Sequence, residues 1–307
     1  MKNIIIILLL VIVGCRTETT KKKWVKEPIK FKYSKEREKQ VWGKILRGAA
    51  PELFYGTQLY NVANSIKNKN NNQLKENIVK LSQEELNYQE EKFKTTLGHL
   101  ALINQNLEAI KILVEAGLNP NIISNNGSSI ITNINSSYNS RLPQSLETLK
   151  YLISKGANVN LVNSKPNTLD RTPLIVAAGS NLENTKVLIK AGANPNFVYK
   201  SSPNDQYPES ALISALQTKR IEIVNYLVFE AKVDYKTLRN SEKTKYNPGG
   251  FQILGYLRTM IFPLNSEKHQ QKMKLVKYLS GQGLDYFNTP IPDYLKKGKT
   301  KEYLAKY

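Results

Sequence analysis

Apolar residues recur at intervals of three and four positions in several short segments of the chain, which is the spacing of one buried helix face. The clearest segments span residues 107–116, 146–155 and 182–191, and they share nearly the same order of apolar and polar positions. Residues 221–230 and 273–282 keep the pattern less closely. A stripe on a helix of two or three turns is not stable alone. The pattern therefore predicts short helices that bury their stripes against one another.

Each of the three clear segments is followed by a glycine, at Gly117, Gly156 and Gly192. Glycine accepts the left-handed backbone that commonly closes a helix. The fourth segment has Ala231 at this place, and the fifth has Gly283. These closing positions step by 39, 36, 39 and 52 residues, so the chain is built from repeats of unequal length.

A shorter helical segment precedes each long one. The clearest begins at Thr172 and Pro173, where the threonine is a good N-cap and the proline suits the first helical position. The segments 96–101 and 210–215 hold the equivalent places in the neighbouring repeats. Each repeat therefore contains a pair of helices.

These residues resemble the ankyrin repeat, in which Thr-Pro-Leu opens a short helix and a leucine-rich helix then ends at Gly-Ala-x-x-Asn. The ideal period of that repeat is about 33 residues, so every unit here carries an insertion. The resemblance implies an all-α repeat fold, an ankyrin-repeat solenoid of helix pairs with short hairpin loops, degenerate and with insertions. We expect this domain to span residues 57–290, with capping repeats at Gln58–Leu81 and Phe251–Asp285.

The start of the chain has a different pattern. Lys2 precedes an unbroken apolar run over residues 4–13, which is too short to cross a bilayer and suits a signal peptide. Gly14 and Cys15 follow, and residues 12–15 resemble a lipobox. This resemblance implies a lipoprotein signal peptide at residues 1–14 and lipidation, for example by palmitate, at Cys15.

Two further segments are polar and basic. We expect residues 15–56 to form a basic tether after the lipidated cysteine, and residues 291–307 to form a Lys-rich C-terminal tail. The tether carries more aromatic residues than a linker needs, so part of it can pack on the first repeat; these residues are Trp24, Phe31, Tyr33 and Trp42.

The net charge is +20, from 45 basic and 25 acidic residues among 307. Such a charge suits nucleic acid, anionic membranes or acidic proteins as partners. However, lysine far outnumbers arginine and is spread along the chain, whereas base and phosphate recognition favours arginine. We interpret the charge as a solvated surface, and we do not expect a nucleic-acid partner.

Residues for catalysis are scarce. Cys15 is the only cysteine, and the two histidines are His99 and His269. The ankyrin resemblance implies a structural role for His99, in hydrogen bonds between neighbouring loops. No motif has the spacing of a metal site or of a serine nucleophile. We therefore expect no enzyme activity, no cofactor, no metal and no small-molecule substrate.

The ankyrin resemblance places a binding groove on the hairpin tips and the inward face of the first helices. Long hairpin tips that carry tyrosines suit an interface, because tyrosine buries a large area with few rotors. The alternative is that these insertions have no binding role and arose because solvent-exposed loops tolerate changes in sequence and length. The candidate partner-binding residues are Phe93, Lys165, Tyr199, Lys200, Asp205, Tyr207, Gln217 and Tyr235.

The sequence leaves three functions open. The first is an anchored periplasmic module that binds another protein, since short ankyrin lipoproteins resemble immunity proteins paired with secreted antibacterial effectors, often lipases. The second is a scaffold or accessory subunit for a resident enzyme of the cell envelope. The third is a basic module that binds anionic lipid or nucleic acid through charge. Arg16, directly after Cys15, favours the outer membrane over the inner one.

Overall fold

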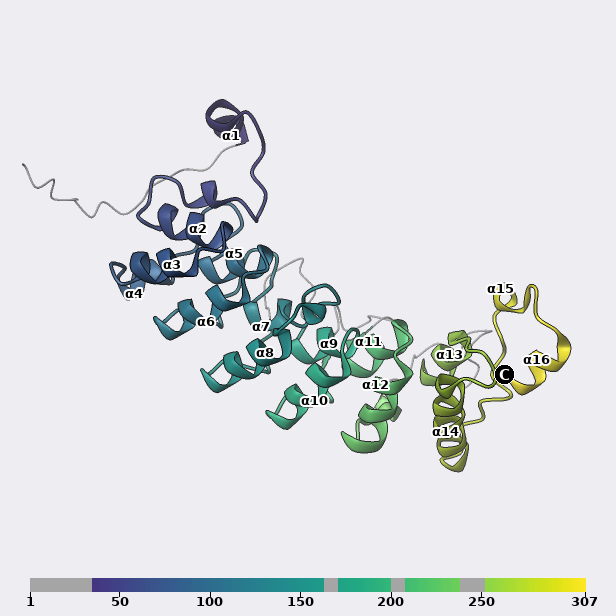
Figure 1. Cartoon of the computed structure of the whole chain (residues 1–307). Coiled ribbons are helices and arrows are strands. Elements are labelled where there is room, and N and C mark those ends of the chain that lie inside the picture. Colours follow the sequence, from purple (N-terminus) through teal and green to yellow (C-terminus); the bar gives the residue numbers. More distant parts are fainter. Residues whose placement is uncertain (1–34, 163–170, 200–207, 238–251) are drawn as a thin grey trace, which may run out of the picture. The chain divides into compact units, whose positions relative to one another are not determined.

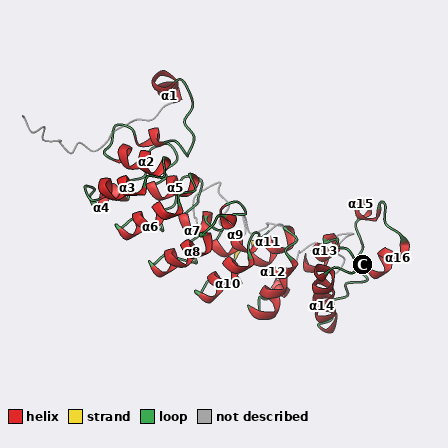
Figure 2. Ribbon diagram, viewed as in Figure 1, coloured by secondary structure: helices red, strands yellow, loops and turns green. Residues whose placement is uncertain are grey.

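The computed structural model of this chain describes residues 35–162, 171–199, 208–237 and 252–307. Within these ranges, helices form almost all of the regular structure and follow one another in pairs (Figures 1 and 2). The first helices of the pairs are α2 (Leu59–Lys67), α5 (Leu97–Ile103), α7 (Ile130–Asn133), α9 (Pro173–Ala178), α11 (Ala211–Gln217) and α13 (Gln252–Thr259). The second helices are α3 (Asn71–Ile78), α6 (Leu107–Glu115), α8 (Ser145–Ser154), α10 (Leu182–Lys190), α12 (Ile221–Asn225) and α14 (Glu267–Gly281).

Shorter elements connect and flank the pairs. They are α1 (Lys35–Trp42), α4 (Gln83–Leu86), α15 (Asp293–Lys296), α16 (Lys301–Lys306), the 3-10 helices η1 (Pro51–Phe54), η2 (Asn139–Arg141) and η4 (Tyr235–Thr237), and the π-helix η3 (Tyr226–Glu230). Two strands, β1 (Val198–Tyr199) and β2 (Glu209–Ser210), pair antiparallel with Val198 opposite Ser210. No helix among the described residues is long and apolar enough to cross a membrane.

Each helix pair packs on the next one. Along the first row α2 contacts α5, α5 contacts α7, α7 contacts α9, α9 contacts α11, and α11 contacts α13. Along the second row α3, α6, α8, α10, α12 and α14 follow one another in the same way. The prediction of an all-α repeat solenoid is confirmed.

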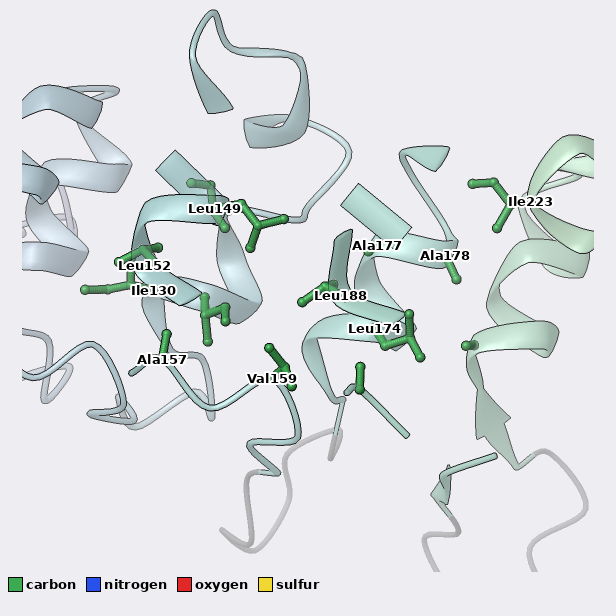
Figure 3. Packing of buried hydrophobic residues seen from close by; sticks show 14 of the residues in the cluster. Ile130, Leu149, Leu152, Ala157, Val159, Leu174, Ala177, Ala178, Leu188 and Ile223 are labelled. Carbon is green, nitrogen blue, oxygen red and sulfur yellow. The ribbon is translucent and has the colours of Figure 1, made fainter. Parts of the chain in front are cut away.

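The core runs between the two rows and continues from pair to pair. Figure 3 shows Leu149 and Leu152 of α8 beside Leu174 of α9 and Leu188 of α10, all of them buried. The apolar stripes predicted from spacing form this core, because one face of each helix has a neighbour on both sides.

The helix ends follow the predicted residues. Thr172 caps α9 by accepting a hydrogen bond from the Ile175 N–H, and Gly117, Gly156 and Gly192 have φ values of 107°, 85° and 90°. In the fourth repeat, which has Ala231 in place of the glycine, the π-helix η3 adds one residue to the helix. The left-handed position then falls on Lys232, with a φ of 53°.

A series of asparagines links the loops of successive repeats. The Asn121 side chain accepts a hydrogen bond from the Asn158 N–H at 2.7 Å and donates one to the Gly156 carbonyl at 3.1 Å. Asn160 makes the same two bonds to the next repeat, to the N–H of Asn194 at 2.7 Å and the carbonyl of Gly192 at 2.9 Å. The asparagine that ends each Gly-Ala-x-x-Asn pattern therefore connects one repeat to the next.

His99 has the structural role that the resemblance implies. Its Nδ1 lies 3.0 Å from the Thr96 hydroxyl, and its Nε2 lies 3.0 Å from the Ser128 carbonyl oxygen in the following loop. Burial lowers the pKa of His99, which keeps the ring neutral for these two hydrogen bonds.

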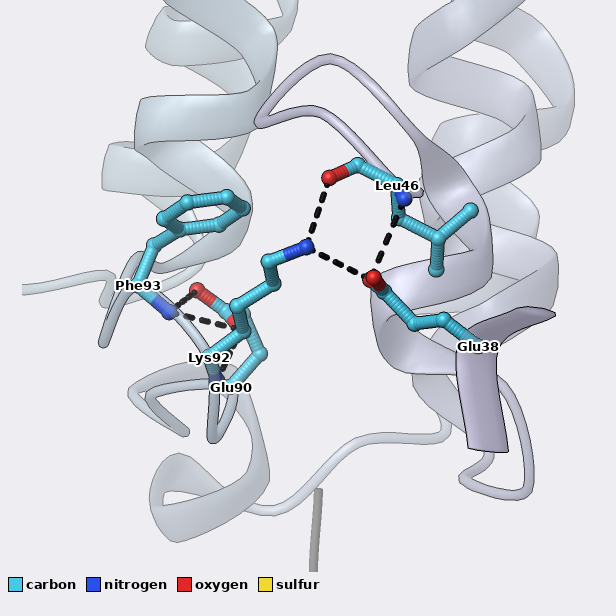
Figure 4. Close-up of polar contacts among 5 residues, drawn as sticks. All are labelled: Glu38, Leu46, Glu90, Lys92 and Phe93. Atoms are coloured by element: carbon cyan, nitrogen blue, oxygen red, sulfur yellow. Dashed lines mark hydrogen bonds and ion pairs between the residues drawn. The ribbon is translucent and has the colours of Figure 1, made fainter. Parts of the chain in front are cut away.

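The segment before the first repeat is folded from residue 35 onward. Glu38 of α1 is only 1 % exposed, and its Oε1 accepts hydrogen bonds from the Lys92 Nζ at 2.6 Å and the Leu46 N–H at 3.1 Å (Figure 4). Lys92 also donates to the Leu46 carbonyl at 2.8 Å. Within the tether predicted over residues 15–56, this ion pair and the buried Phe54 therefore hold the part from residue 35 onward on the first repeat.

The segment predicted as a Lys-rich C-terminal tail, residues 291–307, is also folded. Tyr307 is buried, and its carbonyl accepts hydrogen bonds from Arg258 at 2.6 Å and from the Tyr286 hydroxyl at 3.2 Å. Arg258 also donates to the Thr289 carbonyl and stacks on the Tyr286 ring at 3.9 Å. The sequence of residues 291–307 is rich in lysine, but contacts among Arg258, Tyr286 and Tyr307 hold this segment in place.

Candidate protein-binding surface

A hollow of about 260 Å³ lies across three consecutive repeats, and we call it the central hollow. One side is the face of α9, another is the face of α11, and the third is the long loop between α7 and α8. The lining residues are Ser136, Ser137, Arg171, Ile175, Val176, Gly179, Ser180, Glu209, Ser214, Gln217 and Thr218. Its size suits one or two side chains of a bound protein.

Small residues create the hollow. A Cβ on Gly179 would lie 2.7 Å from the Ser214 Oγ, so glycine allows α9 and α11 to approach closely at this point. Ser180 folds its hydroxyl back onto the Val176 carbonyl at 3.1 Å and thus fills little space. The floor is therefore formed by short polar side chains and by the aliphatic Ile175 and Val176.

The only charged residues of the lining neutralise each other. Arg171 donates from Nε to one Glu209 oxygen at 2.6 Å and from Nη2 to the other at 2.7 Å. This two-point hydrogen bond to Glu209 raises the pKa of Arg171 above its ordinary value, so the guanidinium stays charged. The pairing of β1 with β2 positions Glu209 opposite Tyr199. The central hollow is thus polar but carries no net charge.

The predicted partner-binding residues fall into different places. Gln217 lines the central hollow and donates to the Tyr256 hydroxyl at 3.2 Å. Tyr199 is half-buried in β1, directly opposite Glu209 of the lining. Phe93 is half-buried in the first hairpin loop, where its N–H donates to Glu90. Cys15, Lys165, Lys200, Asp205 and Tyr207 lie outside the described residues.

Tyr235, which we predicted to bind a partner from a hairpin tip, is buried in the structure. Its side chain is only 5 % exposed, and its ring packs against Tyr278 with the centroids 6.3 Å apart. Burial raises the pKa of its hydroxyl to about 12. The neighbouring C-terminal helix pair covers it, so it is not available to a partner.

Most residues that line the central hollow were not predicted from the sequence, because the predicted binding residues are mainly large side chains on hairpin tips. Serines and glycines at the ends of first helices do not resemble a binding motif. The pair Gly179 and Ser180, at the end of α9, nevertheless marks a place where two helices approach closely. Among the described residues, no group of three or more histidine, cysteine or acidic side chains could hold a metal ion.

Residues 140–238, which include α8 to α12, match the family model of ankyrin repeats as three copies. These are ankyrin repeats. The same stacked helix pairs continue on both sides of the matched range, from α2 to α7 and in α13 and α14. No curated protein matches the chain. Ankyrin repeats are a non-enzymatic fold that generally binds proteins, so they indicate protein partners for this chain in general.

Proposed function

We propose that this chain is a membrane-anchored periplasmic protein that binds another protein in the central hollow. The observation that carries the proposal is the neutral lining of this hollow in a chain of net charge +20. A basic module that works by charge would concentrate its unpaired cations at the binding surface. Here the one lining cation, Arg171, is paired with Glu209. The lining instead offers hydroxyls, an amide and aliphatic carbons, which suit a protein side chain.

The anchor in this proposal depends on residues 1–15. The lysine, the apolar run and Gly14-Cys15 are supported by sequence pattern alone. A lipid on Cys15 would hold the ankyrin repeats at the surface of a membrane and raise their local concentration there.

Within this class we favour an immunity protein that neutralises a secreted antibacterial effector. Such a protein must reach its effector in the periplasm and bind it without performing chemistry, which suits an anchored, non-enzymatic binding fold. A scaffold for a resident envelope enzyme is the alternative. The neighbouring gene distinguishes them, because an immunity protein is encoded beside its effector.

The test is to fill the central hollow. Thr218→Trp places a large ring at an exposed position of the lining, just after α11, without replacing a core residue. If a partner side chain binds there, affinity should fall by about 2 kcal/mol or more, as expected when an anchor loses its pocket. The measurements are capture of the neighbouring gene product and rescue of growth when that product is exported.

Glu183→Trp is the matched control, since Glu183 is exposed on the second helix α10 and outside the lining. Both variants should keep the helical signal and melting temperature of the parent chain. Equal capture and equal rescue by the two variants would show that the partner binds elsewhere.

A further inference from the structure

A row of aromatic rings lies where the N-terminal segment meets the first repeat. Trp42, the last residue of α1, packs edge to face on Tyr55, with the ring centroids 6.0 Å apart. Tyr55 packs in the same way on Tyr60 of α2 at 5.3 Å. Tyr55 is 50 % exposed, while Trp42 and Tyr60 are half-buried, so the row lies at the surface and does not belong to the core.

Two exposed isoleucines belong to this N-terminal segment or contact it. Ile45 follows Trp42 by three residues and is 53 % exposed, and Ile103 at the end of α5 is 45 % exposed. The turn at Gly48 lies against Ile103, because a Cβ there would be 3.3 Å from its Cδ1. We call this set the N-terminal apolar patch; it consists of Trp42, Ile45, Tyr55, Tyr60 and Ile103. Clustered exposed apolar residues mark an interaction surface more often than scattered ones do.

The N-terminal apolar patch is fixed in place before any partner binds. The ion pair between Glu38 and Lys92 and the Lys92 bond to the Leu46 carbonyl hold α1 and the following turn on the first hairpin. Asn104, next to Ile103, donates to the Ala49 carbonyl at 3.2 Å. These hydrogen bonds hold the segment that carries Trp42 and Ile45 on the repeats.

The charges and position of the patch point to a membrane. The same short segment exposes Lys35, Lys39 and Arg47, and such cations attract anionic lipid headgroups. Tryptophan and tyrosine favour the headgroup region of a bilayer, where the ring is buried and its polar edge stays hydrated. A protein partner of the central hollow explains neither feature, because the patch lies outside the lining.

Chain length supports the same partner. Twenty residues separate Cys15 from Lys35, and a chain of that length reaches at most about 70 Å when fully extended. A lipid on Cys15 would therefore keep Lys35 within about 70 Å of the membrane, which leaves the patch within reach of the bilayer.

We infer that the N-terminal apolar patch lies in the headgroup region of an anionic phospholipid bilayer. This inference rests on the anchor in the proposed function. The lipid and the patch would form two separate contacts with the membrane, and each adds to the binding. Two contacts also restrict the orientation of the repeats, whereas a lipid alone leaves them free to turn.

The chain has only two tryptophans, so Trp24→Phe leaves Trp42 as the single fluorescent reporter in the full-length protein. We would isolate this variant from membranes and reconstitute it into vesicles of phosphatidylethanolamine and phosphatidylglycerol with brominated acyl chains. Bromine quenches tryptophan only at close range. The expected result is loss of Trp42 emission, relative to vesicles without bromine, and a shift of the emission maximum to shorter wavelength.

The control moves the reporter. In the triple variant Trp24→Phe, Trp42→Phe, Tyr294→Trp the single tryptophan is at a position that is 72 % exposed in the C-terminal segment, and its emission should be unchanged by bromine. Vesicle-bound chains whose Trp42 is not quenched would overturn the patch and leave the anchor intact. Chains that do not bind vesicles would overturn both. Equal quenching of the two reporters would also overturn the patch, since the contact would then be unspecific.

Discussion

At the C-terminal end of the repeats, a lysine side chain is buried and its pKa is strongly lowered. Lys272 of α14 is fully buried; its Nζ donates to the Met260 carbonyl at 3.1 Å and lies 3.5 Å from the centre of the Tyr307 ring. Burial and the nearby Arg258 lower the pKa of Lys272 to about 6. A lysine held in this way costs stability whenever the unfolded chain would be charged.

The resulting pH dependence can be tested with Lys272→Met. Between pH values of about 6 and 10.5 the unfolded chain binds one more proton than the folded chain. The free energy of unfolding should therefore decrease as pH falls towards 6, by at most about 1.4 kcal/mol per pH unit, and level off below. In Lys272→Met this slope should be absent, so its advantage over the parent grows as pH falls.

Denaturant unfolding at several pH values measures this difference. Lys277→Met, an exposed position on the same helix, is the control and should follow the parent at every pH. A parallel pH profile for parent and Lys272→Met would show that Lys272 titrates normally.

At the scale of elements, each second helix from α6 to α12 contacts a second helix on both sides. Leu188 of α10 is fully buried (Figure 3), and α10 contacts α8, α9 and α12. Removing its side chain leaves a cavity that several elements must share.

Leu188→Ala should lower the free energy of unfolding by about 2–5 kcal/mol because of that cavity. Val79→Ala at the end of α3 is the control, since Val79 is 79 % exposed and truncation there should change stability by about 0.5 kcal/mol or less. Urea unfolding followed by circular dichroism gives both values. Similar losses at the two positions would contradict a core between the helix rows.

Element by element, the sequence predicts what depends on local pattern. Apolar spacing, the Thr172 cap and the closing glycines identify the repeats, because each is set within a few residues. The aromatic residues indicated that part of the N-terminal segment packs on the first repeat, but the polar contacts of the two ends were not predicted, since Glu38 and Arg258 are buried by partners 54 and 49 positions away. The central hollow was not predicted for another reason. Small side chains form it, and small residues have no distinctive spacing in the sequence.

At the scale of the whole molecule, the described core begins at residue 35, and the predicted lipidation site lies before it. Folding and attachment to a membrane are thus expected to be separable.

Cys15→Ala should therefore release the chain from the membrane fraction, while its helical content and melting temperature stay unchanged. Fractionation after a high-salt wash measures the first effect, because salt removes proteins that are held by charge alone. A variant that remains in the washed membranes would contradict lipidation at Cys15.

The asparagines that join successive loops are neutral, and so are the backbone groups that they bind. None of these groups gains or loses a proton near neutral pH, and added salt screens charges but not amide hydrogen bonds of this kind. The surface pairs of glutamate and lysine on α6, α8 and α10 do weaken in salt, but exposed pairs contribute little. The ionic composition of the medium thus does not alter these hydrogen bonds between successive repeats.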